Sequence, residues 1–506
     1  MNSPQTNDRR RTIACLVICV LGVFLRLWQY SANRSLWFDE ALLALNIVHR
    51  PFALLLQPLD NNQGAPIAFL FSEKALIELF GNKDYVLRLF PLVTGSVAIF
   101  LMWKVLEDYV GGVGAKFALL SFAISEALIY YASEVKQYSS DVLACLLLLA
   151  IAPQCLNVRN GPKSILLFGF LAGALVWFSH PVVFVISAIF VVLLWDAAIS
   201  GEPPVIRLRR LLSISGAAAL CGISFSILFL ISLRFLASNV ELLSYWQDAF
   251  MPTSPWQDPI WFLKAGYSLL NNLVGWPLAS AGMGAILFIV GCVSFSFKNW
   301  QFASVLMSPL IFVLAASGLH MYPFSGRLML FSVPILLLIV AEGFERARLL
   351  LGRIDPRIGV WATVGLASFL LYAPLAGAVA NFARPPVKEE IKPVMSYLHR
   401  YRAPADVIYV HHGAVPAFEY YASVFGFQKD DYIAGTPSSE QPEMYKKQID
   451  MLKGRERIWI VFSHICHTCR VDEQEVFLKY LDKVGARLAF FQSEGASVYS
   501  YRLLLR

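Results

Sequence analysis

Two adjacent carboxylates, Asp39 and Glu40, are the strongest chemical signal in the sequence. They follow the first long apolar stretch, within Leu36-Trp-Phe-Asp-Glu-Ala41. Carboxylates at a bilayer surface are costly unless they face water or a partner, and the preceding Trp37 and Phe38 suit a membrane interface. Asp39 could therefore act as a general base that takes a proton from an attacking hydroxyl. The alternative is that the pair only favours the N-terminus of an outer helix.

A second polar cluster occupies a short turn between two apolar stretches, from Tyr130 to Asp141. Glu134, Lys136, Tyr138 and Asp141 crowd this turn. A lysine between carboxylates could bind a phosphate together with a cation or sugar hydroxyls. The alternative is a solvated turn whose lysine extends toward water along the membrane surface.

Three further residues lie at the ends of apolar stretches. Arg88 opens the second stretch, and Arg327 closes Tyr322-Pro-Phe-Ser-Gly-Arg327 before the tenth. Either arginine could bind a phosphate, or could only anchor its helix at the interface. His180 precedes a proline in a turn, where it could bind a metal or a sugar, or could be a satisfied, buried turn residue.

Cysteine and histidine are concentrated at one place, His464-Ile-Cys466-His-Thr-Cys469. Zinc sites usually join two separated ligand pairs, and the sequence offers no second pair. In an oxidising compartment Cys466 and Cys469 could form a disulfide. They could also be free structural thiols, or serve a metal or redox role.

The elements that must position these residues are apolar segments long enough to cross a membrane. Of the 506 residues, 57% are hydrophobic and 15% are charged, whereas a soluble chain carries about 25% charge. The mean hydropathy is +0.58. A helix of about 20 apolar residues spans a bilayer. We count about eleven such stretches, near residues 12–30, 87–106, 113–131, 140–157, 164–179, 182–199, 211–236, 280–297, 302–319, 328–345 and 358–380.

Basic residues alternate between the loops that join these stretches. With the N-terminus inside, every inner loop is basic, from Arg9–Arg11 to Arg346–Arg357. The positive-inside rule then places the N-terminus in the cytoplasm and the residues after 380 outside. The net charge of +7 reflects this topology, so we expect no nucleic-acid partner.

The outer side receives two long loops, 31–85 and 237–280, and the C-terminal segment 381–506. We expect residues 1–380, with both loops, to form an α-helical polytopic membrane domain, and residues 381–506 to form an outer α/β domain. Alternating strands and helices in that segment favour a mixed or parallel sheet. The expected elements are strands 406–410 and 457–462, helices 416–424 and 472–484, and a closing hairpin of 486–491 and 496–503.

The membrane part resembles the GT-C superfamily of polytopic glycosyltransferases that use lipid-linked sugars. The likeness is strongest to the bacterial branch related to protein O-mannosyltransferases and lipid A aminoarabinose transferases. Its motifs are Arg34-Ser-Leu-Trp-Phe-Asp-Glu-Ala41, Gly64-Ala-Pro66, Leu87-Arg-Leu-Phe-Pro91 and Ser133-Glu-Val-Lys-Gln-Tyr138. Gln63 departs from the aminoarabinose branch, which has a lysine in the corresponding segment, and this puts lipid A as the acceptor in doubt.

The resemblance implies a reaction and roles for the residues above. A sugar would move from a polyprenyl phosphate to an acceptor hydroxyl outside the membrane, with inversion at the anomeric carbon. Asp39 would be the general base, and Glu40 would hold the acceptor, bind a cation or orient Asp39. Cationic groups must meet the leaving phosphate, and the candidates are Lys136, Arg88 and Arg327. The remaining candidates for binding substrate or a cation are Glu134, Tyr138, Asp141 and His180.

Cofactor, partners and location follow from the same resemblance. Some family members bind a divalent cation such as Mg²⁺ or Mn²⁺ beside the carboxylates, and others act without one. The expected partners are the lipid-linked donor, the bilayer, and a glycolipid, polysaccharide or protein acceptor at a bacterial inner membrane. A flippase for a lipid-linked substrate and a non-catalytic scaffold are the alternative functions. A transporter would show internal repeats and charges at the bilayer midplane, whereas the acids in this sequence gather at the outer surface.

Overall fold

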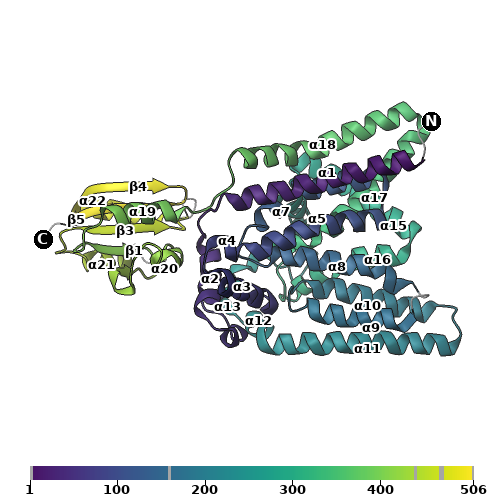
Figure 1. Ribbon diagram of the computed structural model, residues 1–506, viewed down its shortest axis with the longest axis horizontal. Coiled ribbons are helices and arrows are strands. Elements are labelled where there is room, and N and C mark those ends of the chain that lie inside the picture. Colours follow the sequence, from purple (N-terminus) through teal and green to yellow (C-terminus); the bar gives the residue numbers. More distant parts are fainter. Residues whose placement is uncertain (1–3, 158–160, 438–441, 467–471, 504–506) are drawn as a thin grey trace. The chain divides into compact units, whose positions relative to one another are not determined.

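The chain folds into two compact units. The computed structural model describes residues 4–157, 161–437, 442–466 and 472–503. The first unit comprises Met1–Ala32 and Pro51–Pro385, and the second comprises Asn33–Arg50 and Pro386–Arg506 (Figure 1). Segment 33–50, which we expected in the membrane domain, clusters with the C-terminal residues. The Asp39–Glu40 pair therefore belongs to the second unit.

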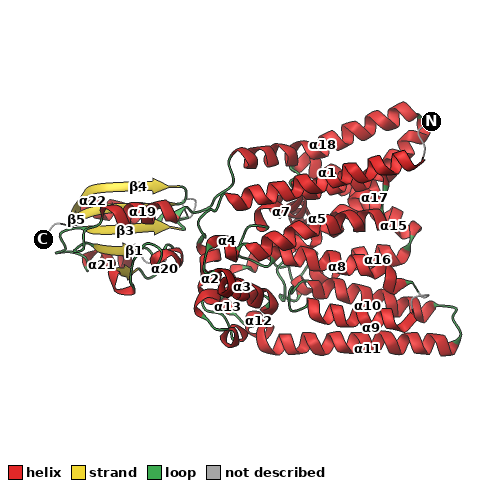
Figure 2. Cartoon of the chain, in the orientation of Figure 1, coloured by secondary structure: helices red, strands yellow, loops and turns green. Residues whose placement is uncertain are grey.

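All elements of regular secondary structure among the described residues of the first unit are helices (Figure 2). Its helices are α1 (Pro4–Ser31), η1 (Phe52–Leu56), α3 (Ile67–Phe80), α4 (Asp84–Leu87), α5 (Leu89–Tyr109), α6 (Gly112–Ile124), α7 (Glu126–Tyr131), α8 (Tyr138–Leu156), α9 (Gly161–Leu175), α10 (Val182–Ile199), α11 (Pro204–Leu228), η3 (Phe229–Leu233), α12 (Arg234–Ala237), α13 (Val240–Tyr245), η4 (Gln247–Ala249), α14 (Pro259–Ser268), η5 (Leu269–Val274), α15 (Leu278–Lys298), α16 (Trp300–Gly318), η6 (Gly326–Ser332), α17 (Val333–Ile354) and α18 (Pro356–Ala383).

The long apolar helices make this a multi-pass membrane protein. Within the described residues, nine helical segments are long and apolar enough to cross a membrane, and two of the eleven expected stretches form shorter helices, α6 and α9. The stretch expected at 113–131 is interrupted at Ser125. The Ser125 hydroxyl accepts a hydrogen bond from Leu128 N–H and so caps the start of α7, which ends α6 after 13 residues.

Helix α17 forms the centre of the membrane unit. Every residue from Val333 to Glu345 is buried, and α17 packs against α6, α15 and α18. Its contact with α15 is close because glycines face the neighbouring backbone. A Cβ atom at Gly343 would lie 1.9 Å from the Leu287 carbonyl oxygen, and one at Gly291 would lie 1.9 Å from that of Ile339. Small residues at such contacts let membrane helices approach closely.

The second unit is a five-stranded mixed sheet with helices. Its elements are α2 (Phe38–His49), α19 (Ile391–Tyr401), β1 (Val407–Val410), α20 (Val415–Ala422), η7 (Lys429–Asp431), β2 (Tyr432–Ala434), α21 (Pro442–Asp450), β3 (Ile458–Ser463), α22 (Glu473–Val484), β4 (Gly485–Ser493) and β5 (Ala496–Leu503). The strand order is β2-β1-β3-β5-β4. Strand β1 is parallel to β2 and β3, whereas β5 is antiparallel to β3 and β4. The expected mixed sheet and closing hairpin are confirmed.

Strand order reverses at β1. The chain leaves β1 for β2 on one side and then returns to β3 on the other side. In open α/β sheets the carboxyl ends of strands at such a switch point form a crevice where ligands bind. A ligand site in the small domain is therefore expected at this edge.

Candidate active site

Asp39 and Glu40 lie in the first turn of α2. Glu40 is fully buried and Asp39 is half-buried. Both carboxylates therefore stand where they complement the dipole at a helix start, and the residue before the helix, Trp37, makes no side-chain capping bond. This does not remove Asp39 as a candidate base, since the first turn also holds it at a defined position.

Acidic residues far along the chain supply the missing cap of α2. Glu389 Oε2 accepts a hydrogen bond from Phe38 N–H at 2.9 Å. Glu390 accepts bonds from the Ser35 N–H and Ser35 hydroxyl, both at 2.9 Å. The Leu36 N–H donates to the Tyr421 hydroxyl at 2.8 Å. Carboxylates at a helix N-terminus satisfy its free N–H groups and complement its dipole.

We call Glu389, Glu390, Lys392 and Tyr421 the clamp, because all four hold segment 33–38. Lys392 Nζ donates to the Asn33 carbonyl oxygen at 2.6 Å, and Lys392 N–H donates to the Ser35 hydroxyl at 3.1 Å. The clamp fixes the backbone that leads into Asp39. Sequence reasoning missed these residues, although Glu389-Glu390 is itself a second pair of adjacent acids directly after the last apolar stretch.

Glu389 also joins the α2 segment to the carboxyl edge of the sheet. Its carboxylate contacts His464 Nδ1 at 2.7 Å and accepts a bond from the Ser463 hydroxyl at 3.3 Å. The His464 ring stacks on Phe38, with ring centroids 4.2 Å apart and planes 8° apart. Lys388 Nζ lies 3.5 Å from the centre of the Trp37 ring. The end of β3 thus supports the same two aromatic residues that precede Asp39.

In the membrane unit, the turn between α7 and α8 is buried rather than solvated. All residues from Ala132 to Asp141 are buried, and Glu134 has no exposed surface. Arg327 Nη1 lies 4.0 Å from Glu134 Oε1, and the guanidinium lies 5.6 Å from the centre of the Tyr138 ring. The solvated-turn alternative is therefore wrong. The structure brings Arg327 to Glu134 and Tyr138, which lie almost 200 residues before it in the sequence.

Lys136 is also buried and does not extend into solvent. Its Nζ donates a hydrogen bond to Gln63 Oε1 at 2.8 Å, and 4% of the residue is exposed. Gln63 stands in the segment where the aminoarabinose branch has a lysine. In this chain Gln63 instead accepts a hydrogen bond from Lys136. Together with Asn62 and Asn239, Gln63 lines a small polar cavity of about 50 Å³.

The remaining candidates lie at or next to the N-terminal ends of α5, α8 and α10. Asp141 is 4% exposed and lies beside Ser179, the residue before His180. Burial lowers the pKa of His180 to about 4, so its ring is neutral at physiological pH. Arg88 is 2% exposed and lies between α4 and α5. That any of these side chains lies close to Asp39 stays a prediction.

The cysteine-rich segment is only partly described. Cys466 is disulfide-bonded, whereas His467 and Cys469 lie outside the described residues. The other six cysteines are free thiols, five of them buried. The disulfide-bonded state of Cys466 argues against a thiolate metal ligand at that position.

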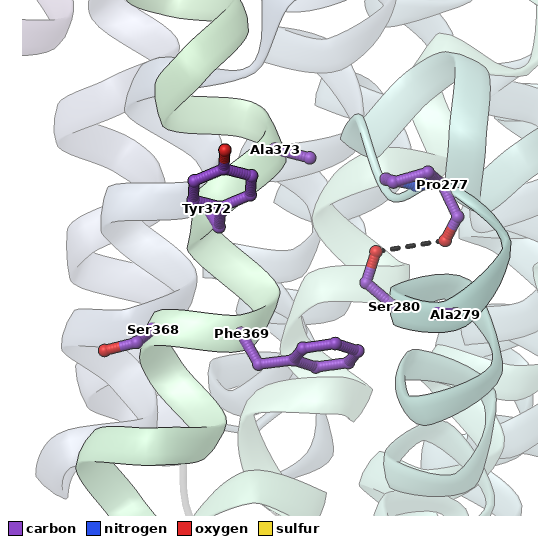
Figure 3. A pocket seen from close by; sticks show the side chains of 7 residues that line it. All are labelled: Pro277, Ala279, Ser280, Ser368, Phe369, Tyr372 and Ala373. Carbon is purple, nitrogen blue, oxygen red and sulfur yellow. Dashed lines mark hydrogen bonds between the residues drawn. The ribbon is translucent and has the colours of Figure 1, made fainter.

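A larger cavity of about 410 Å³ lies between the start of α15 and α18 (Figure 3). Figure 3 shows Phe369 and Tyr372 of α18 on one side of the cavity and Pro277 and Ser280 on the other, where the Ser280 hydroxyl donates to the Pro277 carbonyl oxygen at 3.0 Å. None of the described residues that line this cavity carries a carboxylate or a basic group. Its lining therefore offers no group of the kind that sugar transfer from a phosphate requires.

The clamp generates a prediction about local stability. Replacing Glu389 with Ala removes the acceptor of the Phe38 N–H, and hydrogen bonds to a charged group contribute about 1.5–3 kcal/mol each. We expect peptides covering residues 33–50 to exchange amide hydrogen roughly tenfold faster or more, measured by mass spectrometry of the full chain in nanodiscs. Glu456, an exposed glutamate in the same unit, provides the control Glu456→Ala, which should leave exchange unchanged. Equal protection in the two variants would show that the clamp does not hold the segment.

Comparison with known proteins identifies the fold. No protein-family model matches the sequence, and no curated protein matches it. Solved structures do match. ArnT from Cupriavidus metallidurans bound to undecaprenyl phosphate superimposes with a TM-score of 0.54 at 11% identity, covering 97% of both chains.

Two structures of an archaeal enzyme also match. AglB from Archaeoglobus fulgidus, an oligosaccharyltransferase in complex with an inhibitory peptide and a dolichol phosphate, has a TM-score of 0.54 at 10% identity, covering 96% of this chain and 74% of that one. The Archaeoglobus fulgidus oligosaccharyltransferase with Zn and sulfate matches at a TM-score of 0.54 and 12% identity, covering 97% and 73%. The resemblance to the GT-C superfamily is confirmed as a likeness of fold: the chain has the GT-C fold.

Proposed function

We propose that the protein is a membrane glycosyltransferase that moves a sugar from a polyprenyl phosphate to an acceptor outside the cytoplasm. The observation that carries the proposal is the GT-C fold shared with ArnT over 97% of both chains, in a structure where ArnT binds undecaprenyl phosphate. AglB, with the same fold, binds dolichol phosphate and a peptide. A lipid-linked donor suits a protein with most of its mass in the membrane.

Asp39 is the proposed general base. Its carboxylate would take the proton of the acceptor hydroxyl while that oxygen attacks the anomeric carbon. The bond from that carbon to the phosphate oxygen breaks in the same step, so the configuration inverts. The clamp supports this role because it fixes the backbone on the N-terminal side of Asp39 through bonds to Ser35, Leu36 and Phe38.

The leaving phosphate requires positive charge in a site that excludes water. Arg327 is the leading candidate. Its side chain is 17% exposed, and its Nη1 lies 4.0 Å from Glu134 Oε1 in the buried polar cluster. Arginine can hold two phosphate oxygens at once. Lys136 would act next to it after releasing Gln63, and Arg88 is the third candidate.

The proposal also assigns roles to the remaining candidate residues, the orientation in the membrane and the classes of substrate. Glu40 would orient Asp39, hold the acceptor or bind a divalent cation such as Mg²⁺ or Mn²⁺. Glu134, Tyr138, Asp141 and His180 would contact sugar hydroxyls or that cation. The N-terminus would lie in the cytoplasm of a bacterial inner membrane and the second unit outside it. The acceptor class is a glycolipid, a polysaccharide or a protein, and the sugar is a hexose, an aminosugar or a pentose.

The base assignment is tested by Asp39→Asn. With a panel of polyprenyl-phosphate sugars in nanodiscs, wild type should consume one donor, and the variant should lose at least ~100-fold in kcat, the lower range for a general base. The control Asp430→Asn changes an exposed aspartate of the same unit and should keep full activity. Wild-type rates in the folded Asp39→Asn protein would remove Asp39 as the base while leaving the enzyme class intact.

The phosphate assignment is tested by Arg327→Lys. Lysine keeps the charge but loses the two-pronged contact with phosphate, so kcat/KM for the donor should fall by about tenfold or more, in line with a charge-assisted bond of at least about 1.5 kcal/mol. Arg234→Lys is the matched control, because Arg234 lies in the same unit against the Phe235 ring. A fall of the same size in both variants would argue against a specific role for Arg327.

A further inference from the structure

Three potential metal ligands meet at the switch point of the small sheet. His411 and His412 directly follow β1, and Glu473 is the first residue of α22. The His411 N–H donates to the Val461 carbonyl oxygen of β3 at 2.9 Å, so the histidines lie at the carboxyl edge shared by the parallel strands β1 and β3. Crevices at such edges are the usual ligand sites of open α/β sheets. None of these residues is part of the proposed transfer reaction.

The two separations between a histidine nitrogen and the Glu473 carboxylate match those around a tetrahedral ion. His411 Nε2 lies 3.1 Å from Glu473 Oε2, and His412 Nε2 lies 3.6 Å from the same oxygen. Zinc bonds to nitrogen and oxygen are about 2.0–2.1 Å long, which places neighbouring ligands of a tetrahedron about 3.3 Å apart. The two observed separations bracket that value. One ligand atom from each of the three residues lies within 4.8 Å of the others, and no other such group occurs among the described residues.

The position of His411 suits a metal ligand. His411 has no exposed surface. Although its Nε2 is close to Glu473, the contact does not have hydrogen-bond geometry, and among the described residues this buried nitrogen has no hydrogen-bond partner. Such orphaned buried groups are rare and call for an explanation. An ion between the two histidines and the carboxylate would supply the missing partner.

The surroundings hold the three ligands in place. The Tyr445 hydroxyl donates to Glu473 Oε1 at 2.7 Å, which leaves Oε2 to face both histidines. The Tyr445 ring lies parallel to the His412 ring, at 4° and 6.4 Å between centroids. Such supporting contacts commonly orient metal ligands. One contact must change on binding: Gly413 N–H donates to His411 Nδ1 at 3.3 Å, and Nδ1 would carry the proton once Nε2 bound metal.

We propose that His411, His412 and Glu473 form a binding site for one divalent transition-metal ion of the zinc type. Two imidazole nitrogens with one carboxylate favour zinc over magnesium or calcium, which prefer oxygen ligands. The side chains of His412 and Glu473 are 24% and 16% exposed, so the ion can enter, and a fourth position stays open for water. The ion links the end of β1 to the start of α22.

The test is Zn²⁺ titration of the full chain in nanodiscs, purified without a histidine tag and stripped with chelator. Competition with a chromogenic chelator gives the affinity and stoichiometry, and Co²⁺ absorption reports tetrahedral geometry. Wild type should bind one ion tightly. His412→Ala and Glu473→Gln should each weaken binding at least ~100-fold, because changes to supporting residues alone cost about 10–100-fold.

Two control variants separate this site from zinc bound elsewhere on the chain. His399→Ala removes a histidine of α19 outside the cluster and should bind as wild type does. Asp39→Asn should also keep the ion, which distinguishes this site from a cation in the candidate active site. Thermal unfolding without metal checks that each variant folds. The proposal is overturned if wild type binds no Zn²⁺ at micromolar concentration, or if His412→Ala and Glu473→Gln bind it as wild type does.

Discussion

The hydrogen bond from the Phe38 N–H to the Glu389 carboxylate is the contact on which the proposed chemistry depends. Helix α2 starts at Phe38 without a local side-chain cap, and its first turn carries Asp39 and Glu40. The free N–H groups at such a start must find partners, and that of Phe38 finds one about 350 residues later in the sequence. The C-terminal domain is therefore part of the structure that presents the candidate base. A cap supplied from so far away also couples the position of Asp39 to the folding of the small sheet.

The polar side chains proposed to act in the membrane unit are buried. Glu134 and Lys136 are removed from water, and a buried charge requires a partner. Arg327 and Gln63 lie next to them. A lipid phosphate arriving here would find donors already desolvated, where electrostatic interactions are strong. The apolar cavity between α15 and α18 offers space without such donors among its described lining residues, so volume alone does not mark the site.

Local patterns predicted much of the fold. Hydropathy located the nine described helices that are long and apolar enough to cross a membrane, because a lipid-facing helix must be apolar over its whole length. It overestimated the length of α6 and α9, which are shorter. The sequence pattern of the C-terminal segment predicted β1, β3 and the β4–β5 hairpin. The errors have local causes as well. Ser125 stops α6 with a single hydroxyl, and β2 has only three residues, which is too short for a periodic signal.

Contacts between distant residues could not be predicted from patterns. Nothing in residues 33–50 indicates that they pack with residues 386–506. The pairing of Glu389 with Phe38, and of Glu473 with His411 and His412, depends on the topology of the sheet. The family motifs contain Asp39, Glu134 and Lys136, whereas Arg327 became a candidate through its position before an apolar stretch. The structure brings Arg327 to Glu134.

The most direct test of the account is an experimental structure of the chain in a lipid nanodisc with a bound polyprenyl phosphate. The account predicts that the phosphate contacts Arg327 and that the Asp39 carboxylate faces the same cavity, while Glu389 still accepts the Phe38 N–H. A phosphate bound away from Arg327, with Asp39 directed into lipid, would contradict it.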